Sequence, residues 1–282
     1  MPVTLGASSG GAFPQLTITQ SQTWVPPQDG NVCIHLVGAG GGAFGGSQLT
    51  PRGGGAGAYA KIPTLAVTTS GSYTLVVGVG GVGGGFGDNG ITGGNSTIAG
   101  TGLTGTKTCS GGTASSSSAV GNGGTVSGSG QSWAGYTGGA GGAGSGGGGG
   151  AVGVFATGMV GGNTSAHSMG GYQGIGGITD AASGGLVMSG YGIICGGSKR
   201  SYNVNLNQSA IANFQSVDPA GDLCGGGGVL IGAGYIYIRG ADGGIGGGGG
   251  GGQSATGSGP GNPYSFGGFG GDGIILIQYL PW

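Results

Sequence analysis

The sequence predicts an all-β protein: an antiparallel β-sandwich formed by N- and C-terminal strands, plus a lattice of polyglycine-II helices, with almost no α-helix. Three observations lead to this fold class. Short segments rich in Val, Ile, Thr and Tyr stand at both ends of the chain, and such residues favour strands. Glycine supplies 86 of the 282 residues. Glutamate is absent, and long helix-forming runs are missing with it.

The first predicted strands lie near the N-terminus. "LTITQSQTWV" (Leu16–Val25) alternates and ends at Pro26–Pro27, which cannot continue a hydrogen-bonded ladder. "NVCIHLVG" (Asn31–Gly38) follows the turn signal Asp29–Gly30. Two further segments, separated by "TTSG", complete this group: Gly57–Val67 and Ser72–Gly80.

Two more strands are predicted near the C-terminus, at Gly228–Gly240 and Asp272–Trp282. Both are rich in Val, Ile, Leu or Tyr and are bounded by turn residues. We expect the N- and C-terminal strands to pair in one antiparallel sandwich that holds the conventional hydrophobic core.

The glycine runs between these strands predict the second part of the fold. Examples are Gly38–Gly46, Gly53–Gly57, Gly80–Gly87, Gly138–Gly150 and Gly243–Gly252. A polyproline-II-like helix turns every three residues and has no internal hydrogen bonds. Without side chains, such helices can lie side by side and pair their N–H and C=O groups, as buried backbone requires. The runs are therefore predicted to be lattice members.

Flexible linkers are the alternative interpretation of glycine-rich sequence. Linkers join domains, however, and no second hydrophobic domain is apparent for these runs to join. Single apolar residues such as Val79, Val82, Phe86, Ile175 and Ile178 interrupt the runs and could cover the outer face of a lattice. We expect one domain, 1–282, with N-terminal strands and first glycine runs in 1–100, runs with loop inserts in 101–224, and closing strands in 225–282.

Composition excludes several classes of function. The net charge is −1, so phosphate contacts to nucleic acid are not expected. No apolar run approaches the ~20 residues of a membrane span, so membrane insertion is not expected. The start "MPVTLGASSGG" has no visible secretory signal. Cys33, Cys109, Cys195 and Cys224 could form two disulfides in three possible connectivities, but free, buried thiols are the preferred expectation. The four are far apart in sequence and include no C-x-x-C pair, so a zinc site is not expected.

No pattern specifies an enzyme, a metal or a cofactor. "GVGGVG" (Gly78–Gly83) matches a dinucleotide-binding fingerprint, but the helix that this motif needs cannot follow it. His35 lies in an alternating strand, where a hydrogen-bonded histidine is the default. Most of the seven aspartates occupy turn contexts such as Asp29–Gly30 and Asp272–Gly273. We therefore expect no catalytic residues, no metal ligands and no cofactor.

Four stretches carry a resemblance to a known family: "TWVPPQDGNVCIHLVGAGGGAFGG", "GGGAGAYAKI", "GSYTLVVGVGGVGGG" and "GGFGGDGIILIQY". They resemble the glycine-rich domain of bacteriophage tail-fibre and receptor-binding proteins. The matching features are Trp24–Pro27, Val32–Gly42, Gly53–Tyr59 and Gly270–Ile277. The middle of the chain is similar in style to the tail-fibre tip adhesins of T-even-like phages, although no separate fibre-attachment domain of their kind is seen.

The resemblance implies a non-enzymatic phage adhesin on the virion, which recognises a bacterial glycan or outer-membrane protein and contacts other virion proteins. Recognition residues would lie in the inserts 131–136, 163–172, 199–215 and 262–266. The candidate receptor-binding residues are Trp133, Tyr136, His167, Tyr172, Tyr202, Phe214, Tyr264 and Phe266. A structural fibre or decoration protein of the virion is one alternative. A polyglycine-II ice-binding protein is another, although the irregular glycine spacing disfavours the flat face that ice requires.

Overall fold

The computed structural model describes residues 15–46, 52–128, 134–143, 148–149, 167–168, 215–216, 228–231, 237–240, 242–254 and 264–281. These residues contain strands and extended segments and no α-helix. No helix in the described part of the chain could cross a membrane. The all-β class that the sequence predicts is therefore confirmed for this part.

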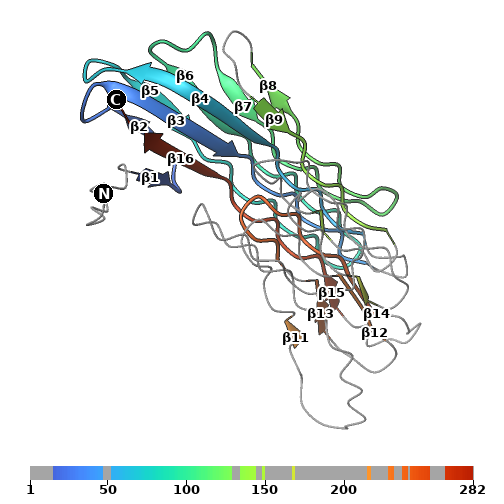
Figure 1. Cartoon of the computed structure of the whole chain (residues 1–282). Helices are drawn as coiled ribbons and strands as arrows, with labels where there is room; N and C mark the ends of the chain where they lie inside the picture. Colours follow the sequence, from blue (N-terminus) through green and yellow to red (C-terminus); the bar gives the residue numbers. More distant parts are fainter. Residues whose placement is uncertain are drawn as a thin grey trace.

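Two five-stranded antiparallel sheets lie at one end of the molecule (Figure 1). The first sheet has the order β1 (Gln15–Ile18), β16 (Ile274–Tyr279), β3 (Gly30–Val37), β4 (Tyr59–Val67) and β9 (Ala134–Tyr136). The second has the order β2 (Gln22–Trp24), β5 (Tyr73–Val76), β6 (Ser96–Gly100), β7 (Lys107–Cys109) and β8 (Val126–Ser127). Because β16 pairs with both β1 and β3, the predicted pairing of N- and C-terminal strands is confirmed.

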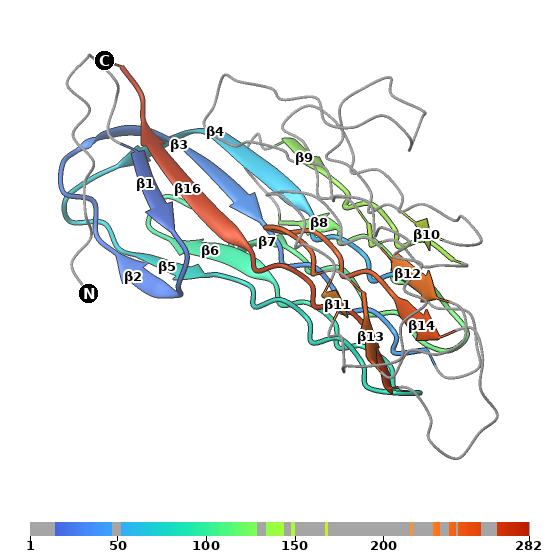
Figure 2. The ribbon, with the colours of Figure 1, turned by 90° about the horizontal axis from the view of Figure 1, so that it is seen from below.

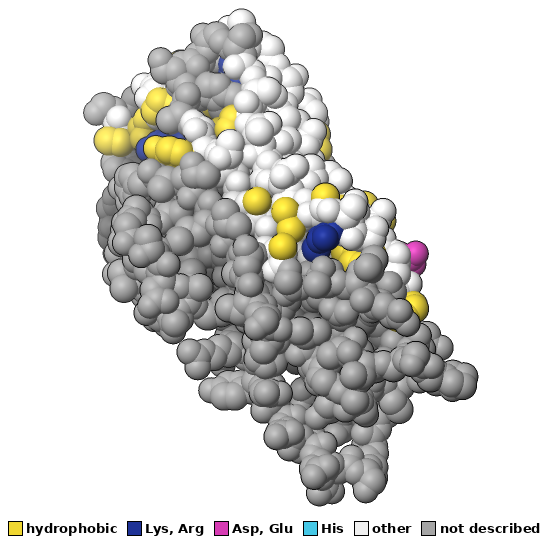
Figure 3. All heavy atoms as spheres, turned by 90° about the vertical axis from the view of Figure 1, so that its right-hand side faces the viewer, with side chains coloured by type: hydrophobic (Ala, Val, Ile, Leu, Met, Phe, Trp, Pro, Cys, Tyr) yellow, Lys and Arg dark blue, Asp and Glu magenta, His cyan; other side chains and the backbone are white. Residues whose placement is uncertain are grey.

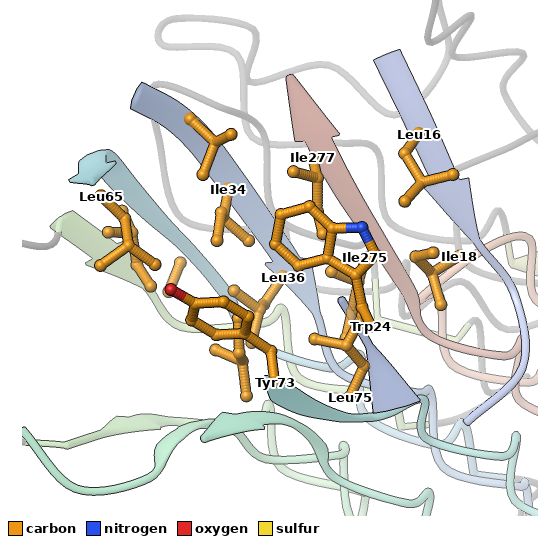
Figure 4. Close-up of a cluster of buried hydrophobic side chains, with 14 of the residues drawn as sticks. Leu16, Ile18, Trp24, Ile34, Leu36, Leu65, Tyr73, Leu75, Ile275 and Ile277 are labelled. Carbon is orange, nitrogen blue, oxygen red and sulfur yellow. The ribbon is translucent and has the colours of Figure 1, made fainter. Parts of the chain in front are cut away.

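One hydrophobic cluster joins the two sheets. The first sheet contributes alternate residues of its strands, and the second contributes the rings of Trp24 and Tyr73, whose centroids are 5.3 Å apart. Figure 4 shows the Trp24 ring beside Ile275 and Ile277 on β16, and the Tyr73 ring extending toward Leu65 on β4. Full burial of one aliphatic side chain contributes about 1.5–3 kcal/mol, so this cluster is the main apolar contribution to stability among the described residues.

Two of the predicted strands are divided in the structure. Residues 16–25 form β1 in one sheet and β2 in the other, because the chain crosses between sheets at residues 19–21, where the Ser21 hydroxyl accepts the Val77 N–H at 3.0 Å. Residues 228–240 contain β12 (Gly228–Ile231) and β13 (Tyr237–Arg239), which belong to different small sheets with parallel pairs. Strands β6, β7 and β8 are additional to the sequence prediction.

Beyond the sheets, the chain continues as extended glycine-rich segments that are bonded through their backbones with a period of three residues. Segment 38–45 donates its N–H groups to three other segments in turn. The N–H groups of residues 38, 41 and 44 donate to the carbonyls of residues 58, 55 and 52. Those of residues 39, 42 and 45 donate to the carbonyls of residues 94, 91 and 88. Those of residues 40 and 43 donate to the carbonyls of residues 271 and 268. Every third residue thus faces the same neighbour.

The carbonyls of segment 38–45 accept from three further segments. The carbonyls of residues 39 and 42 accept the N–H groups of residues 112 and 115. Those of residues 40 and 43 accept the N–H groups of residues 81 and 84, and that of residue 41 accepts the N–H group of residue 249. Neighbours around this segment are also bonded to one another, through the donor–acceptor pairs 55–113, 93–112, 94–79, 270–81, 271–247 and 54–249. Six segments therefore surround residues 38–45 in a closed ring.

Glycine is needed where two segments face each other. A Cβ atom on Gly41 would fall on the carbonyl of Thr113, and one on Gly81 would fall on that of Ile91. Some side chains in these segments lie at the surface: Val79 and Val82, three residues apart, are 72% and 49% exposed, whereas Ala39, Ala43 and Phe44 are buried. The expectation that Val79, Val82 and Phe86 lie on an outer face agrees with their exposure, whereas Ile175 and Ile178 lie outside the described residues.

Polar side chains add hydrogen bonds between two segments that are already paired through their backbones, 89–95 and 111–117. Asn89, Thr92 and Asn95 recur every third residue, and their side-chain oxygens accept the N–H groups of Ser117, Ala114 and Gly111 at 3.2, 3.3 and 3.1 Å. The same three-residue period therefore governs both the backbone contacts and these side-chain caps.

Two small three-stranded sheets lie at the end remote from the five-stranded sheets (Figures 1 and 2). We call this the distal end. One has the order β10 (His167–Ser168), β12 and β14 (Gly252–Ser254), and the other has β11 (Gln215–Ser216), β13 and β15 (Tyr264–Phe266). Strand β14 also contacts β13 and β15, so the two small sheets adjoin.

Candidate functional site

The predicted site residues fall into three groups in the structure. The backbones of His167, Tyr264 and Phe266 belong to the small sheets at the distal end. Tyr136 lies on β9, in the first large sheet. Trp133, Tyr172, Tyr202 and Phe214 lie outside the described residues. The structure brings the first group to one end and separates Tyr136 from it.

The distal end gathers strands from distant parts of the sequence. His167 pairs with Val229 in one small sheet, while Tyr237 pairs with Tyr264 in the other. Both sheets continue from glycine segments: the Gly240 N–H, for example, bonds to the Phe266 carbonyl at 3.0 Å. Three of the four predicted inserts (163–172, 199–215 and 262–266) therefore have a described strand at this end.

Tyr136 belongs to a second cluster, on the first large sheet. Strand β9 is an edge strand, and its register places Tyr136 opposite Tyr59 of β4. The two rings stack with centroids 6.5 Å apart and planes 11° apart. Tyr59 is buried, whereas Tyr136 is partly exposed.

A histidine and a cysteine continue this cluster along β3. The Nδ1 atom of His35 lies 2.7 Å from the Tyr59 hydroxyl, and its Nε2 atom lies 3.4 Å from the Cys33 thiol. In either tautomer, one ring nitrogen donates a hydrogen bond and the other accepts one. His35 is thus a hydrogen-bonded strand histidine, as expected, and Cys33 is a free, buried thiol, as is Cys109. Cys195 and Cys224 lie outside the described residues.

The electrostatics of the cluster keep both the thiol and the imidazole neutral. Burial raises the pKa of the Cys33 thiol, and the nearby Lys61 charge offsets this only in part. Burial also lowers the pKa of His35 to about 4, and the Lys61 charge adds to this effect. An activated cysteine needs the opposite condition, a lowered thiol pKa. The cluster is therefore chemically a set of neutral donors and acceptors beside one ammonium group.

The sequence alone does not predict that Tyr59, Lys61 and His35 lie beside Tyr136. The local signal was limited to alternation: Cys33 and His35 share one face of β3, and Tyr59 and Lys61 share one face of β4. The strand register, with His35 opposite Lys61 and Tyr59 opposite Tyr136, comes from long-range pairing.

Charged groups are sparse on the face of the molecule in Figure 3, where uncharged polar atoms and backbone cover most of the described surface. Three carboxylates accept hydrogen bonds from backbone N–H groups: Asp272 from Gly80 at 2.7 Å, Asp242 from Phe269 at 2.8 Å and Asp29 from Thr69 at 2.6 Å. Within the described ranges, no three His, Cys, Asp or Glu side chains are grouped so as to hold a metal ion.

No protein-family model matches the sequence, and no curated protein matches it either.

Proposed function

We propose that this chain is a phage receptor-binding protein of the tail-fibre tip, in which a polyglycine-II lattice and a β-sandwich hold recognition loops at the distal end. The observation that carries the proposal is the three-residue period of the backbone bonds around segment 38–45. A polyglycine-II helix has three residues per turn, so its equivalent N–H groups recur at every third residue toward the same neighbour.

The two large sheets support the sandwich part of the proposal, because a single cluster of buried side chains contains residues of both. A scaffold whose backbone groups are paired in several directions is rigid, and the connections between its members can vary in sequence without disturbing it. Such a scaffold suits a protein whose loops must change with the receptor.

The position of the inserts supports a role in binding. Strands β10, β11 and β15 come from three inserts that are far apart in sequence, yet all lie at the distal end. These three inserts contain Tyr and Phe among Ser, Asn and Gln. Such side chains combine large, rigid contact surfaces with adaptable hydrogen bonding. A bacterial glycan or an outer-membrane protein is the proposed receptor, and the virion exterior is the proposed location.

Competition for the host surface tests this function. Host cells are incubated with the purified protein, and adsorption of the phage that encodes it is then measured. We expect a lower adsorption rate with folded protein and an unchanged rate with the same protein after thermal unfolding. A fibre or decoration protein without receptor affinity would leave adsorption unchanged at micromolar concentration, and that result would contradict the proposal.

A further inference from the structure

We propose that the cluster of Tyr136, Tyr59, Lys61 and His35 on the first large sheet is a second binding site, and that it takes a pyranose carrying a carboxylate or a phosphate. This site does not involve the distal inserts. A test of this site is therefore independent of the receptor-binding role proposed above.

The stacked tyrosines provide a fixed aromatic wall. Tyr136 is partly exposed on an edge strand, and its ring lies nearly parallel to the buried ring of Tyr59. A tyrosine has few rotatable bonds, so it offers contact area at low entropic cost. An apolar ring face with a hydroxyl at its rim matches a sugar, which also has an apolar C–H face and polar edges.

The residues behind this wall hold it in place. The Tyr59 hydroxyl is fixed by His35 at 2.7 Å, and His35 is fixed in turn by Cys33 at 3.4 Å. The His35 ring also lies against the Tyr59 ring, with centroids 5.9 Å apart. A binding group works best when neighbouring hydrogen bonds lock its conformation. The cluster therefore presents Tyr136 on a pre-organised support.

Lys61 supplies the preference for an anion. It lies two residues after Tyr59 on β4 and opposite His35 in the register, which places all three on the same face of the sheet. In the described part of the chain Lys61 forms no ion pair, so its ammonium group is not neutralised by a carboxylate. A charged ligand group within reach would form a charge-assisted hydrogen bond, which is stronger than a neutral one.

The site can be tested on the purified protein with defined sugars. Trigalacturonic acid and glucose 1-phosphate are the anionic probes, and galactotriose and glucose are the neutral ones; binding is measured by calorimetry and by NMR shifts. We expect the anionic probes to bind more tightly, and their affinity to fall with added salt, because salt screens partly exposed charges. Equal affinity for anionic and neutral probes, or no binding of any probe, would overturn the proposal.

Three variants connect the binding to these residues. Tyr136→Ala should weaken anionic probes by about tenfold or more, the loss expected when a central aromatic contact is removed. Lys61→Gln should abolish the difference between anionic and neutral probes. Phe86→Ala, which alters an exposed ring on a glycine segment, is the control and should bind as the wild type does.

Circular dichroism and the dispersed NMR spectrum establish that each variant is folded. Tyr136→Phe retains the stacked ring, so it should retain most of the affinity even if Tyr136→Ala perturbs the edge strand. Unchanged binding in folded Tyr136→Ala would overturn the proposal, and so would an unchanged anion preference in folded Lys61→Gln.

Discussion

At the scale of single residues, the position of each glycine relative to its neighbours decides whether a side chain is tolerated. Gly81 faces another segment: a Cβ there would fall on the Ile91 carbonyl and lie 2.6 Å from the Gly42 nitrogen. Gly85, in the same segment, faces outward, and a Cβ there would meet only the Asp88 carboxylate, at 3.2 Å. The sequence predicts that glycine is required within the runs, but it does not distinguish these two positions.

This difference predicts opposite outcomes for two alanine substitutions. Gly81→Ala should lower the free energy of unfolding by more than the ~1 kcal/mol typical of point mutants, because the new methyl group would force the backbone of the facing segment at Ile91 to move. Gly85→Ala should leave it within about 0.5 kcal/mol, or raise it slightly, because alanine restricts the unfolded chain. Urea denaturation of both variants measures the difference. Equal stability of the two proteins would contradict the close contact at Gly81.

The part-buried imidazole of His35 predicts a dependence of stability on pH. Its pKa is lowered to about 4 in the folded protein and is near 6.5 in an unfolded chain. Between these values the unfolded state binds the proton and the folded state does not, so stability falls as the pH decreases from about 6.5 to about 4. At 1.36 kcal/mol per pKa unit, the loss is at most about 3 kcal/mol.

Denaturation at pH 7, 5.5 and 4.5 measures this loss, with His35→Gln as the reference. Other titrating groups contribute equally to both proteins, so the difference between them isolates His35. We expect the wild type to lose more stability than His35→Gln over this interval. Parallel pH profiles would mean that His35 is not held in its neutral form by the fold.

At the scale of elements, the strands with strong local patterns were predictable and the short ones were not. The alternation in β3 and β4 and the apolar run of β16 specify strands that pair as expected. Strand β7 has three residues and β8 has two, and they are specified by pairing, β7 to β6 and β8 to β7, rather than by their own sequences. The crossing that divides β1 from β2 depends likewise on a distant contact, from Ser21 to Val77.

The pairing of the glycine segments, like that of the short strands, cannot be predicted from local sequence. Their existence follows from composition, but their neighbours do not: residues 249, 271 and 112 all bond to segment 38–45 across large distances in sequence. One local signal was present and was missed, namely Asn89, Thr92 and Asn95, whose three-residue spacing matches the period of the backbone bonds. The binding cluster could be predicted only for Tyr136, because its partners depend on strand register.

Hydrogen exchange should distinguish interior from outward amides within these elements. In run 243–252, the N–H groups of Gly248 and Gly249 bond to the carbonyls of Gly149 and Gly41, so we expect them to exchange slowly. The amides of Val79 and Val82 make no hydrogen bond within the described structure and should exchange rapidly. NMR-detected exchange of assigned amides provides the comparison. Random-coil rates throughout 243–252 and 138–150 would contradict an ordered lattice.

At the scale of the whole molecule, the two ends have different roles in the proposed function. The large sheets hold the conventional core at one end, and the glycine segments extend from them to the small sheets at the other (Figure 2). Extended segments can hold the small sheets in a fixed position over this length only if they are hydrogen-bonded to one another side by side, as segment 38–45 is to six others. The distal strands therefore depend on the segments for their placement.

This separation predicts that receptor binding can be lost without loss of folding. Tyr202 lies outside the described residues, in insert 199–215, whose strand β11 is at the distal end, and we expect Tyr202→Ala to abolish adsorption to host cells. Binding surfaces concentrate their energy in a few Trp, Tyr and Arg residues, whose truncation can cost over 2 kcal/mol. Phe86→Ala, an exposed aromatic on a glycine segment, is the matched control and should adsorb normally. Adsorption assays with phage carrying each variant, together with the melting temperature of each purified protein, measure both properties. Normal adsorption by folded Tyr202→Ala would favour a structural virion protein, and a lowered melting temperature would instead indicate that this ring contributes to folding.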